Sequence, residues 1–219
     1  MASLKKDLIT ATIAIVFVTL AFGIAYPLIT TGVAQVLFPN AANGSKIEIN
    51  GRVVGSKLIG QDFSRPVIGP NGKPKLDEEG EPMLEPNPAF FQGRPSVTGY
   101  SANVTFFNNL GPNSKELSEF MKETLHAYLK LERPYNPGLT AADVPVDAVS
   151  TSASGVDPHI SEANAEIQAH RVAAVRHLPL TRVMELVSDN TEGRFLDLFG
   201  EPGVNVLKLN LAVEEEAKS

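Results

Sequence analysis

Residues 8–29 read LITATIAIVFVTLAFGIAYPLI, and this stretch decides the organisation of the chain. It is almost continuously apolar, and no residue from Leu8 to Ser45 is charged. As a helix rising about 1.5 Å per residue, the stretch is about 33 Å long, which matches the hydrocarbon core of a bilayer. The sequence therefore predicts one transmembrane helix over residues 8–30.

The residues before this helix predict its orientation. Lys5 and Lys6 lie just before the apolar run, and the preference of such residues for the cytoplasmic side places residues 1–7 there as a short stub. Asp7 between them and the run weakens this signal only slightly, because acidic residues contribute little to it. Residues 31–219 then lie on the periplasmic or extracellular side. The alternative is a cleaved signal peptide, whose apolar core is only about 7–15 residues long. Cleavage would then fall in the region of Ala34.

One face of the predicted helix is a candidate subunit interface. Thr19 and Gly23 have the spacing of small residues that lets a neighbouring helix approach closely. Thr12 and Pro27 fall near the same face, and we expect Pro27 to bend the helix where it leaves the membrane. Small residues are common in any membrane helix, so plain contact with lipid also fits this pattern.

The charge and the composition limit the partners of the outer part. The chain carries a net charge of −6, and its first 38 residues carry +1 from two lysines and one aspartate, so the remainder carries −7. An acidic domain repels phosphate groups, which argues against nucleic-acid binding and against docking on anionic lipid. Because the chain has no cysteine, packing must hold the domain without disulfides or zinc thiolates.

Turn signals organise the beginning of the outer domain. Asn50 and Gly51 separate two short segments, 45–49 and 52–59, and favour a tight hairpin turn between two strands. Residues 69–88 contain five prolines and three glycines with almost no apolar periodicity. This composition predicts a mobile surface loop, inserted between two more structured stretches.

The second half of the chain predicts helices and strands in one domain. Asn113 is a candidate cap for a helix whose apolar stripe runs from Leu117 to Leu129 and which ends near Arg133. Residues 204–213 alternate between apolar and polar side chains, which predicts a half-buried strand paired with the first hairpin in an α+β domain. Between them we expect a strand over 144–150, a helix over 161–176 with Ile167, Ala174 and Val175 buried, and a helix capped by Thr181 with Val183, Leu186 and Val187 buried.

The sequence gives little indication of catalytic chemistry. No stretch has the spacing of a phosphate-binding loop, a serine elbow or a zinc-binding helix. Ser152, Ser154, Asp157 and His159 lie close together, and their groups would suit a nucleophilic hydrolase. The same residues are good formers of turns and caps, which favours a structural role. Asp157 and His159 with His170 match no spacing of metal ligands, so no metal site is expected.

Short stretches spread along nearly the whole chain carry a family resemblance. They are YPLITT (26–31), ANGS (42–45), GSKLIGQ (55–61) with Phe63, GRPS (93–96), NLGP (109–112), VSTSASG (149–155), DPHI (157–160), Gln168 with RVA (171–173), GEP (200–202), VNVL (204–207) and LNLA (209–212). In this order, and with the apolar helix in the matching place, the chain resembles the C subunit family of the Kdp potassium-transporting ATPase, a bacterial membrane complex.

The resemblance implies a non-catalytic subunit of an ATP-driven potassium importer in the inner membrane. Its partners would be a channel-like potassium-binding subunit, a P-type ATPase subunit that hydrolyses ATP, and a small peptide subunit. The family is described as a catalytic chaperone that raises the affinity of the ATPase subunit for ATP, and Gln168 corresponds to its candidate for nucleotide contact. ATP and potassium are then ligands of the complex, and no cofactor is expected on this chain itself. Gly155, Asp157, His159 and Arg171 are further candidate interface residues.

Two features depart from the family pattern. The loop over 69–88 is longer than the link that the family has there, and residues 105–108 read TFFN where the family usually has a Ser-Gly-Gly-Ser run. We expect altered loop geometry at both places.

The predicted orientation conflicts with nucleotide contact by Gln168, because ATP is cytoplasmic. A simpler arrangement places the outer domain over the external ion entrance of the channel-like subunit. Its acidic charge would raise the local cation concentration there, within a Debye length of about 8 Å. An anchored exported hydrolase that uses the serine and histidine cluster, or a cell-envelope binding module, are the alternative functions.

Overall fold

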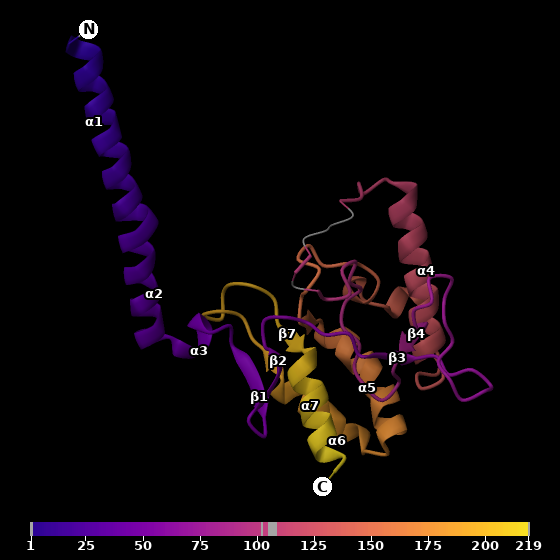
Figure 1. The fold of residues 1–219 in the computed structure, drawn as a ribbon. Coiled ribbons are helices and arrows are strands. Elements are labelled where there is room, and N and C mark those ends of the chain that lie inside the picture. The colour runs from indigo at the N-terminus through magenta and orange to yellow at the C-terminus, as the bar shows by residue number, and fades with distance from the viewer. Residues whose placement is uncertain (1, 102, 105–108, 219) are drawn as a thin grey trace. The chain divides into compact units, whose positions relative to one another are not determined.

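The computed structural model of the chain describes residues 2–101, 103–104 and 109–218 (Figure 1). The chain divides into two compact units, Met1–Ser56 and Lys57–Ser219, each of which is described by itself. An apolar helix near the N-terminus precedes a domain of helices and short strands, so the predicted α+β class is confirmed. The expected change of loop geometry at 105–108 lies outside the described residues.

One long apolar helix dominates the first unit. It consists of α1 (Ala2–Val18), a π-helical segment η1 (Thr19–Ala25) and α2 (Tyr26–Leu37). Residues Ser3–Leu37 are long and apolar enough to cross a membrane. These 35 residues span about 52 Å at about 1.5 Å per residue, so the helix exceeds the hydrocarbon core and continues well past residue 30.

Pro27 lies inside this helix and not at its end, which corrects the expected bend at the helix exit. Proline has no amide hydrogen, and its ring crowds the carbonyl four residues earlier, here that of Gly23. The wider π-helical segment ends directly before Tyr26 and Pro27, in the first turn of α2. The widening gives the crowded carbonyl room, so the helix continues to Leu37.

A short helix and a hairpin complete the first unit. After α3 (Pro39–Ala42), strands β1 (Lys46–Ile49) and β2 (Arg52–Ser56) pair antiparallel, as the sequence predicts. Asn50 and Gly51 have φ values of 52° and 76°, the positive values that a tight two-residue hairpin turn requires.

The second unit begins with an exposed β-ribbon. Strands β3 (Ser64–Pro66) and β4 (Leu84–Pro86) pair antiparallel, and the segment between them forms further backbone hydrogen bonds. The predicted loop over 69–88 is therefore largely exposed but is paired along part of its backbone. Main-chain pairing needs no apolar periodicity, which is why the composition did not reveal it. The mobility of the segment stays a prediction.

Helix α4 (Lys115–Glu132) follows the expected pattern with a shifted start. Its cap is Ser114, whose hydroxyl accepts a hydrogen bond from the amide of Leu117, and not Asn113. Both residues are good caps, and the serine side chain makes the bond that defines the helix start. The helix ends before the C-cap Arg133, as predicted from the proline that follows.

The strand predicted over 144–150 is wrong. The short 3₁₀ turn η3 (Val146–Ala148) occupies this region, and a second one, η2 (Ala141–Asp143), lies directly before it. Asp143 and Thr140 form a reciprocal capping box that closes η2. Within 144–150, the carboxylate of Asp147 accepts hydrogen bonds from Ser161 and Asn164, so side-chain bonds hold this segment as a turn despite its β-branched residues.

Three helices form most of the hydrophobic core. Helix α6 (Leu180–Asp189) packs against both α5 (Glu162–Arg176) and α7 (Val206–Glu216). The expected extent of α5 is confirmed, but the cap of α6 is Pro179 and not Thr181, because the helix begins two residues earlier. Val183, Leu186 and Val187 are buried, as predicted.

The buried face of α5 differs from the expected one. Ile167 and Val175 are only partly buried and Ala174 is exposed. Alanines and one valine face the core instead, and small side chains let α6 pack closely. The apolar residues of α5 that are buried are Ala165, Ala169, Val172 and Ala173.

The C-terminal strand predicted over 204–213 is also wrong. Strand β7 (Gly203–Asn205) is short and lies between β5 (His159–Ile160) and β6 (Thr191–Glu192), with antiparallel pairing to both and not to the first hairpin. Asn205 then caps α7 by accepting a hydrogen bond from the amide of Lys208. The apolar residues over 206–213 fit both a strand and a helix period, and the cap decides for the helix.

Candidate functional site

Helix α5 carries a polar face into the interior of the second unit. Asn164, Gln168 and Arg171 follow one another at helical spacing and therefore lie on one side of the helix. They are 1 %, 1 % and 0 % exposed. Glu132, the last residue of α4, is buried against Arg171. We call these four residues the buried polar network.

The Arg171 guanidinium makes four hydrogen bonds in the interior of the unit. Its Nε donates to Glu132 Oε1 at 2.8 Å, and neither side chain is exposed. Its Nη1 donates to the carbonyls of Pro88 and Phe90 at 2.6 and 2.9 Å, and its Nη2 donates to Gln168 Oε1 at 2.9 Å. Burial raises the pKa of Glu132, and the charge of Arg171 opposes this rise. One cation thus ties α4 and α5 to the segment after β4.

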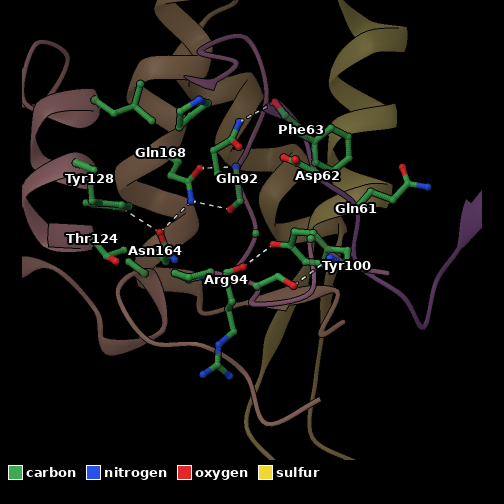
Figure 2. A pocket seen from close by; sticks show the side chains of 18 residues that line it. Gln61, Asp62, Phe63, Gln92, Arg94, Tyr100, Thr124, Tyr128, Asn164 and Gln168 are labelled. Carbon is green, nitrogen blue, oxygen red and sulfur yellow. Dashed lines mark hydrogen bonds between the residues drawn. The ribbon is translucent and has the colours of Figure 1, made fainter. Parts of the chain in front are cut away.

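Gln168 makes four hydrogen bonds within the protein, and Figure 2 draws those with Gln92 and Asn164. Its Oε1 accepts from the amide of Gln92 at 2.7 Å and from Arg171 at 2.9 Å. Its Nε2 donates to the carbonyl of Gln92 at 3.1 Å and to Asn164 Oδ1 at 2.9 Å. A side-chain amide has two donor hydrogens and one acceptor oxygen with two lone pairs, so these bonds use its full capacity. Contact with a nucleotide would require some of them to break.

A cavity of about 260 Å³ lies beside Gln168, with Tyr100 and Tyr128 among its walls (Figure 2). The hydroxyl of Tyr128 donates to Asn164 Oδ1 at 2.9 Å, and that of Tyr100 donates to the carbonyl of Arg94. Burial raises the pKa of both phenols, so both stay protonated as donors. These hydroxyls therefore serve to hold the walls together.

The GRPS and VSTSASG stretches are joined next to this cavity. A side chain at Gly93 would overlap the Tyr100 hydroxyl, and a Cβ at Gly60 would lie 2.7 Å from the Tyr100 ring. The Ser96 hydroxyl donates to the carbonyl of Gly155 at 2.6 Å. Gly155 has a φ of 71°, a value that favours glycine. Both stretches thus owe their residue types to local packing and turn geometry.

The serine cluster forms a turn. Ser152 Oγ accepts from the amide of Gly155 at 3.0 Å, and Ser154 Oγ accepts from the amide of Val156 at 3.2 Å. Among the described residues, no hydrogen bond joins either serine to His159. The arrangement is that of turn-forming hydroxyls.

His159 lies between two carboxylates instead. Its Nδ1 is 3.6 Å from Asp157 Oδ1, and its Nε2 is 3.5 Å from Glu192 Oε2. The contact with Asp157 raises the pKa of His159, partial burial opposes this, and Glu192 adds to the rise. Burial acts to raise the pKa of Asp157. Hydrogen bonds from His159 and the charge of Arg94, whose Nη1 is 3.3 Å from Asp157 Oδ2, outweigh burial, so the pKa of Asp157 is lowered. The group is a charged link between β5 and β6.

The four candidates in the membrane helix are exposed among the described residues. The hydroxyl of Thr12 donates to the carbonyl of Leu8 at 2.9 Å. A Cβ at Gly23 would lie 3.7 Å from the Thr19 side chain, so these two residues share a face as expected. Pro27 adjoins the π-helical segment. A partner helix on this face stays a prediction.

The sequence-based candidates therefore separate into four groups. Gln168 and Arg171 belong to the buried polar network, Asp157 and His159 to the charged link, and the others to a turn or to the membrane helix. Sequence reasoning missed Glu132 and Asn164. The signal for Asn164 was present, because polar residues at helical spacing on an alanine-rich helix indicate a buried polar face.

A long apolar helix followed by a small α+β domain is typical of an anchored subunit in a membrane assembly, and comparison with known proteins specifies which. A sequence model of the family described as "K+-transporting ATPase, c chain" matches residues 8–215. The chain is 45% identical over 213 residues to a protein of Polaromonas naphthalenivorans, which covers 95% of both chains. It is 41% identical over 209 residues to one of Caldanaerobacter subterraneus (95% and 94% covered) and 39% identical over 213 residues to one of Koribacter versatilis (96% and 95% covered).

All three relatives are named "Potassium-transporting ATPase KdpC subunit". The chain belongs to this KdpC family, which confirms the resemblance seen in the sequence. It is thus a membrane subunit of a potassium-transporting ATPase.

Proposed function

We propose that this chain is a non-catalytic subunit that assembles and stabilises an ATP-driven potassium importer. The long helix anchors it in the bacterial inner membrane with residues 1–7 in the cytoplasm and residues 31–219 outside. Its partners are a channel-like potassium-binding subunit, a P-type ATPase subunit and a small peptide subunit. The family match, the apolar helix and the lysines before it support this proposal.

The observation that carries the proposal is that the candidate site residues of the second unit form hydrogen bonds within that unit. Gln168 and Arg171 bond to other described residues of this chain, and Ser152 and Ser154 hold a turn. A hydrolase needs a nucleophile within reach of a base, and the described serines have no such contact with His159. These contacts favour a rigid accessory domain.

The chaperone role implied by the family then acts through the partner subunits. An outer domain cannot reach cytoplasmic ATP, and Gln168 has no free hydrogen-bonding capacity. We therefore propose that the chain raises the ATP affinity of the P-type subunit indirectly, by favouring the assembled arrangement of the complex. ATP and potassium are bound by the partners.

The acidic charge of the outer domain supports a second element of this proposal. A net charge of −7 over the external ion entrance would raise the local potassium concentration within about 8 Å. Glu78→Gln with Glu79→Gln removes two exposed acids, and Lys73→Gln with Lys75→Gln is the matched control in the same ribbon. Steering predicts a weaker apparent potassium affinity for the first pair only. An unchanged affinity in both pairs would rule steering by these acids out.

Deletion of this chain tests the proposal as a whole. Assembly, measured as co-purification of the channel-like and P-type subunits from membranes, is expected to fall together with potassium-stimulated ATP hydrolysis. A complex that assembles fully but hydrolyses ATP poorly would instead place this chain in the catalytic cycle. For Gln168→Glu complexes that do assemble, we expect a KM for ATP within about twofold of wild type. A selective rise in that KM would support nucleotide contact.

A further inference from the structure

The loop between β6 and β7 exposes an unusual set of apolar side chains. We call residues 193–202, which read GRFLDLFGEP, the apolar loop. Its exposed large hydrophobic residues are Phe195 (71 %), Leu196 (68 %), Leu198 (74 %) and Phe199 (64 %). Single exposed apolar residues are normal on a protein surface, but four within five positions form a contiguous patch, which marks an interaction site.

The apolar loop is closed by its own backbone. The amide of Phe195 donates to the carbonyl of Phe199 at 2.8 Å, and the amide of Phe199 donates back to the carbonyl of Phe195 at 3.0 Å. Leu196 and Asp197 have φ values of 54° and 58°, in the left-handed region that costs free energy for a leucine. The loop therefore holds its apolar side chains outward in a defined turn, which lowers the entropy cost of binding a partner.

The base of the loop is fixed to the rest of the unit. Arg194 and Glu201 form an ion pair at 2.7 Å across the start and the end of the turn. Glu192, directly before the loop, bonds to Lys208 on α7 at 2.8 Å and lies beside His159. The apolar tip thus stands on a charged base that is anchored to the sheet and to α7.

Charge decides which partner fits this patch. The segment 192–201 holds Glu192, Asp197 and Glu201 against Arg194 alone, a net charge of −2 on a domain of −7. An anionic bilayer would repel this rim, and two copies of the loop would repel each other. A protein surface with an apolar cleft and basic residues around it complements both the tip and the rim.

We propose that the apolar loop docks into an apolar cleft with a basic rim on another subunit of the same ATPase, outside the lipid. This inference rests on the proposed function, because it requires the chain to be part of that complex. The four apolar side chains supply the buried centre of the interface, and Asp197 and Glu201 supply its charged edge. The structure of the chain alone leaves these groups in water.

Cross-linking in the assembled ATPase tests the proposal directly. The chain has no cysteine, so Leu198→Cys provides a unique thiol for a photoreactive maleimide on the chain. The wild-type chain, which has no thiol, measures background labelling of the other subunits. Val146→Cys is the matched control, because Val146 is 68 % exposed on η3, outside the loop. Irradiation is expected to join Leu198→Cys to another subunit, at a yield well above that of Val146→Cys.

The other outcomes overturn the proposal. A product with lipid only would make the loop a membrane contact, a product with a second copy would make it a self-association surface, and no product would leave it without a partner. Co-purification of the wild-type chain separates these cases from failure of the proposed function. If the chain co-purifies with the ATPase and the loop gives no subunit product, only the docking surface is wrong.

Side-chain replacement gives a second readout. Phe195→Gln with Phe199→Gln keeps the backbone bonds of the loop but removes the apolar tip, and we expect about tenfold or greater loss of the chain from the purified complex. Ile68→Gln with Leu76→Gln, two residues of the exposed ribbon that are each 58 % exposed, is the matched control and should be retained. Equal retention of both variants would contradict the proposal.

Discussion

The buried polar network and the apolar loop break the usual rule of burial in opposite directions. Arg171 is a charged residue that is 0 % exposed, whereas Leu198 is an apolar residue that is 74 % exposed. The chain itself supplies the hydrogen-bond partners of Asn164, Gln168 and Arg171 in the network. The loop is left uncovered by the described residues. Buried polar side chains that find their partners within the chain indicate a structural role. Exposed apolar side chains that the described residues leave uncovered indicate a role in assembly.

The largest effect is expected from breaking the buried ion pair. Arg171→Leu leaves Glu132 without its cation and removes the donors to Pro88, Phe90 and Gln168. The free energy of unfolding should fall by about 3–5 kcal/mol. Urea denaturation of the full chain in detergent measures this loss.

The matched double variant sharpens this prediction. Glu132→Leu with Arg171→Leu removes both charges, and Glu132 Oε2 already lacks a hydrogen-bond partner among the described residues. A buried pair can often be replaced by apolar residues at little cost, so the double variant should be more stable than Arg171→Leu alone. A double variant that is less stable would show that the hydrogen bonds of Arg171 matter more than the uncompensated carboxylate.

A smaller effect is expected at Gln168. Gln168→Ala leaves the backbone groups of Gln92 and one Arg171 donor unpaired in the interior, and should lower the free energy of unfolding by about 2–4 kcal/mol. His170→Ala, at an exposed position of the same helix, is the control and should stay within about 0.5 kcal/mol of wild type. A Gln168→Ala chain as stable as the control would mean that the network does not hold the domain together.

The charged link at His159 should make stability depend on pH. Because its pKa is raised in the folded state, its contribution is fully present below the unfolded pKa of about 6.5 and is lost as the pH rises through the folded value. The melting temperature should therefore fall as the pH rises above about 6.5. His159→Gln should remove this part of the pH dependence, and Glu192→Gln should weaken it. A His159→Gln profile that matches wild type would exclude the link as its source.

The smallest effect on stability is expected in the apolar loop. Phe195→Gln with Phe199→Gln should change the free energy of unfolding of the chain alone by no more than about 0.5 kcal/mol, because water already surrounds both rings. Leu209→Ala, at a buried position of α7, should cost about 2–5 kcal/mol and provides the contrast. Marked destabilisation by the loop variant would mean that the tip packs on its own domain.

The sequence was most informative where one local signal dominates. The uncharged run from Leu8 predicted the apolar helix, Asn50 and Gly51 predicted the first hairpin, and the proline after Arg133 predicted the end of α4. It failed over 204–213, because the same apolar residues satisfy a period of two and a period of 3.6. The side-chain cap at Asn205 decides for the helix. The periodicity of apolar residues does not show whether a capping hydrogen bond forms.

The buried polar network was predicted only in part, and from the family resemblance, not from a local signal. Matching stretches pointed to Gln168 and Arg171, but their partners come from Gln92 and Glu132, which are far away in the sequence and carry no local signal. Nothing in the sequence distinguished the exposed phenylalanines of 195–199 from core residues, since hydrophobicity alone does not say which side of the fold a loop faces.

Hydrogen exchange of the chain alone in detergent and within the assembled ATPase tests the central comparison most directly. Peptides over 193–202 should become more protected on assembly, because a partner covers the apolar loop, while peptides over 164–171 should exchange equally slowly in both states. Unchanged exchange over 193–202, with new protection over 164–171, would contradict the account.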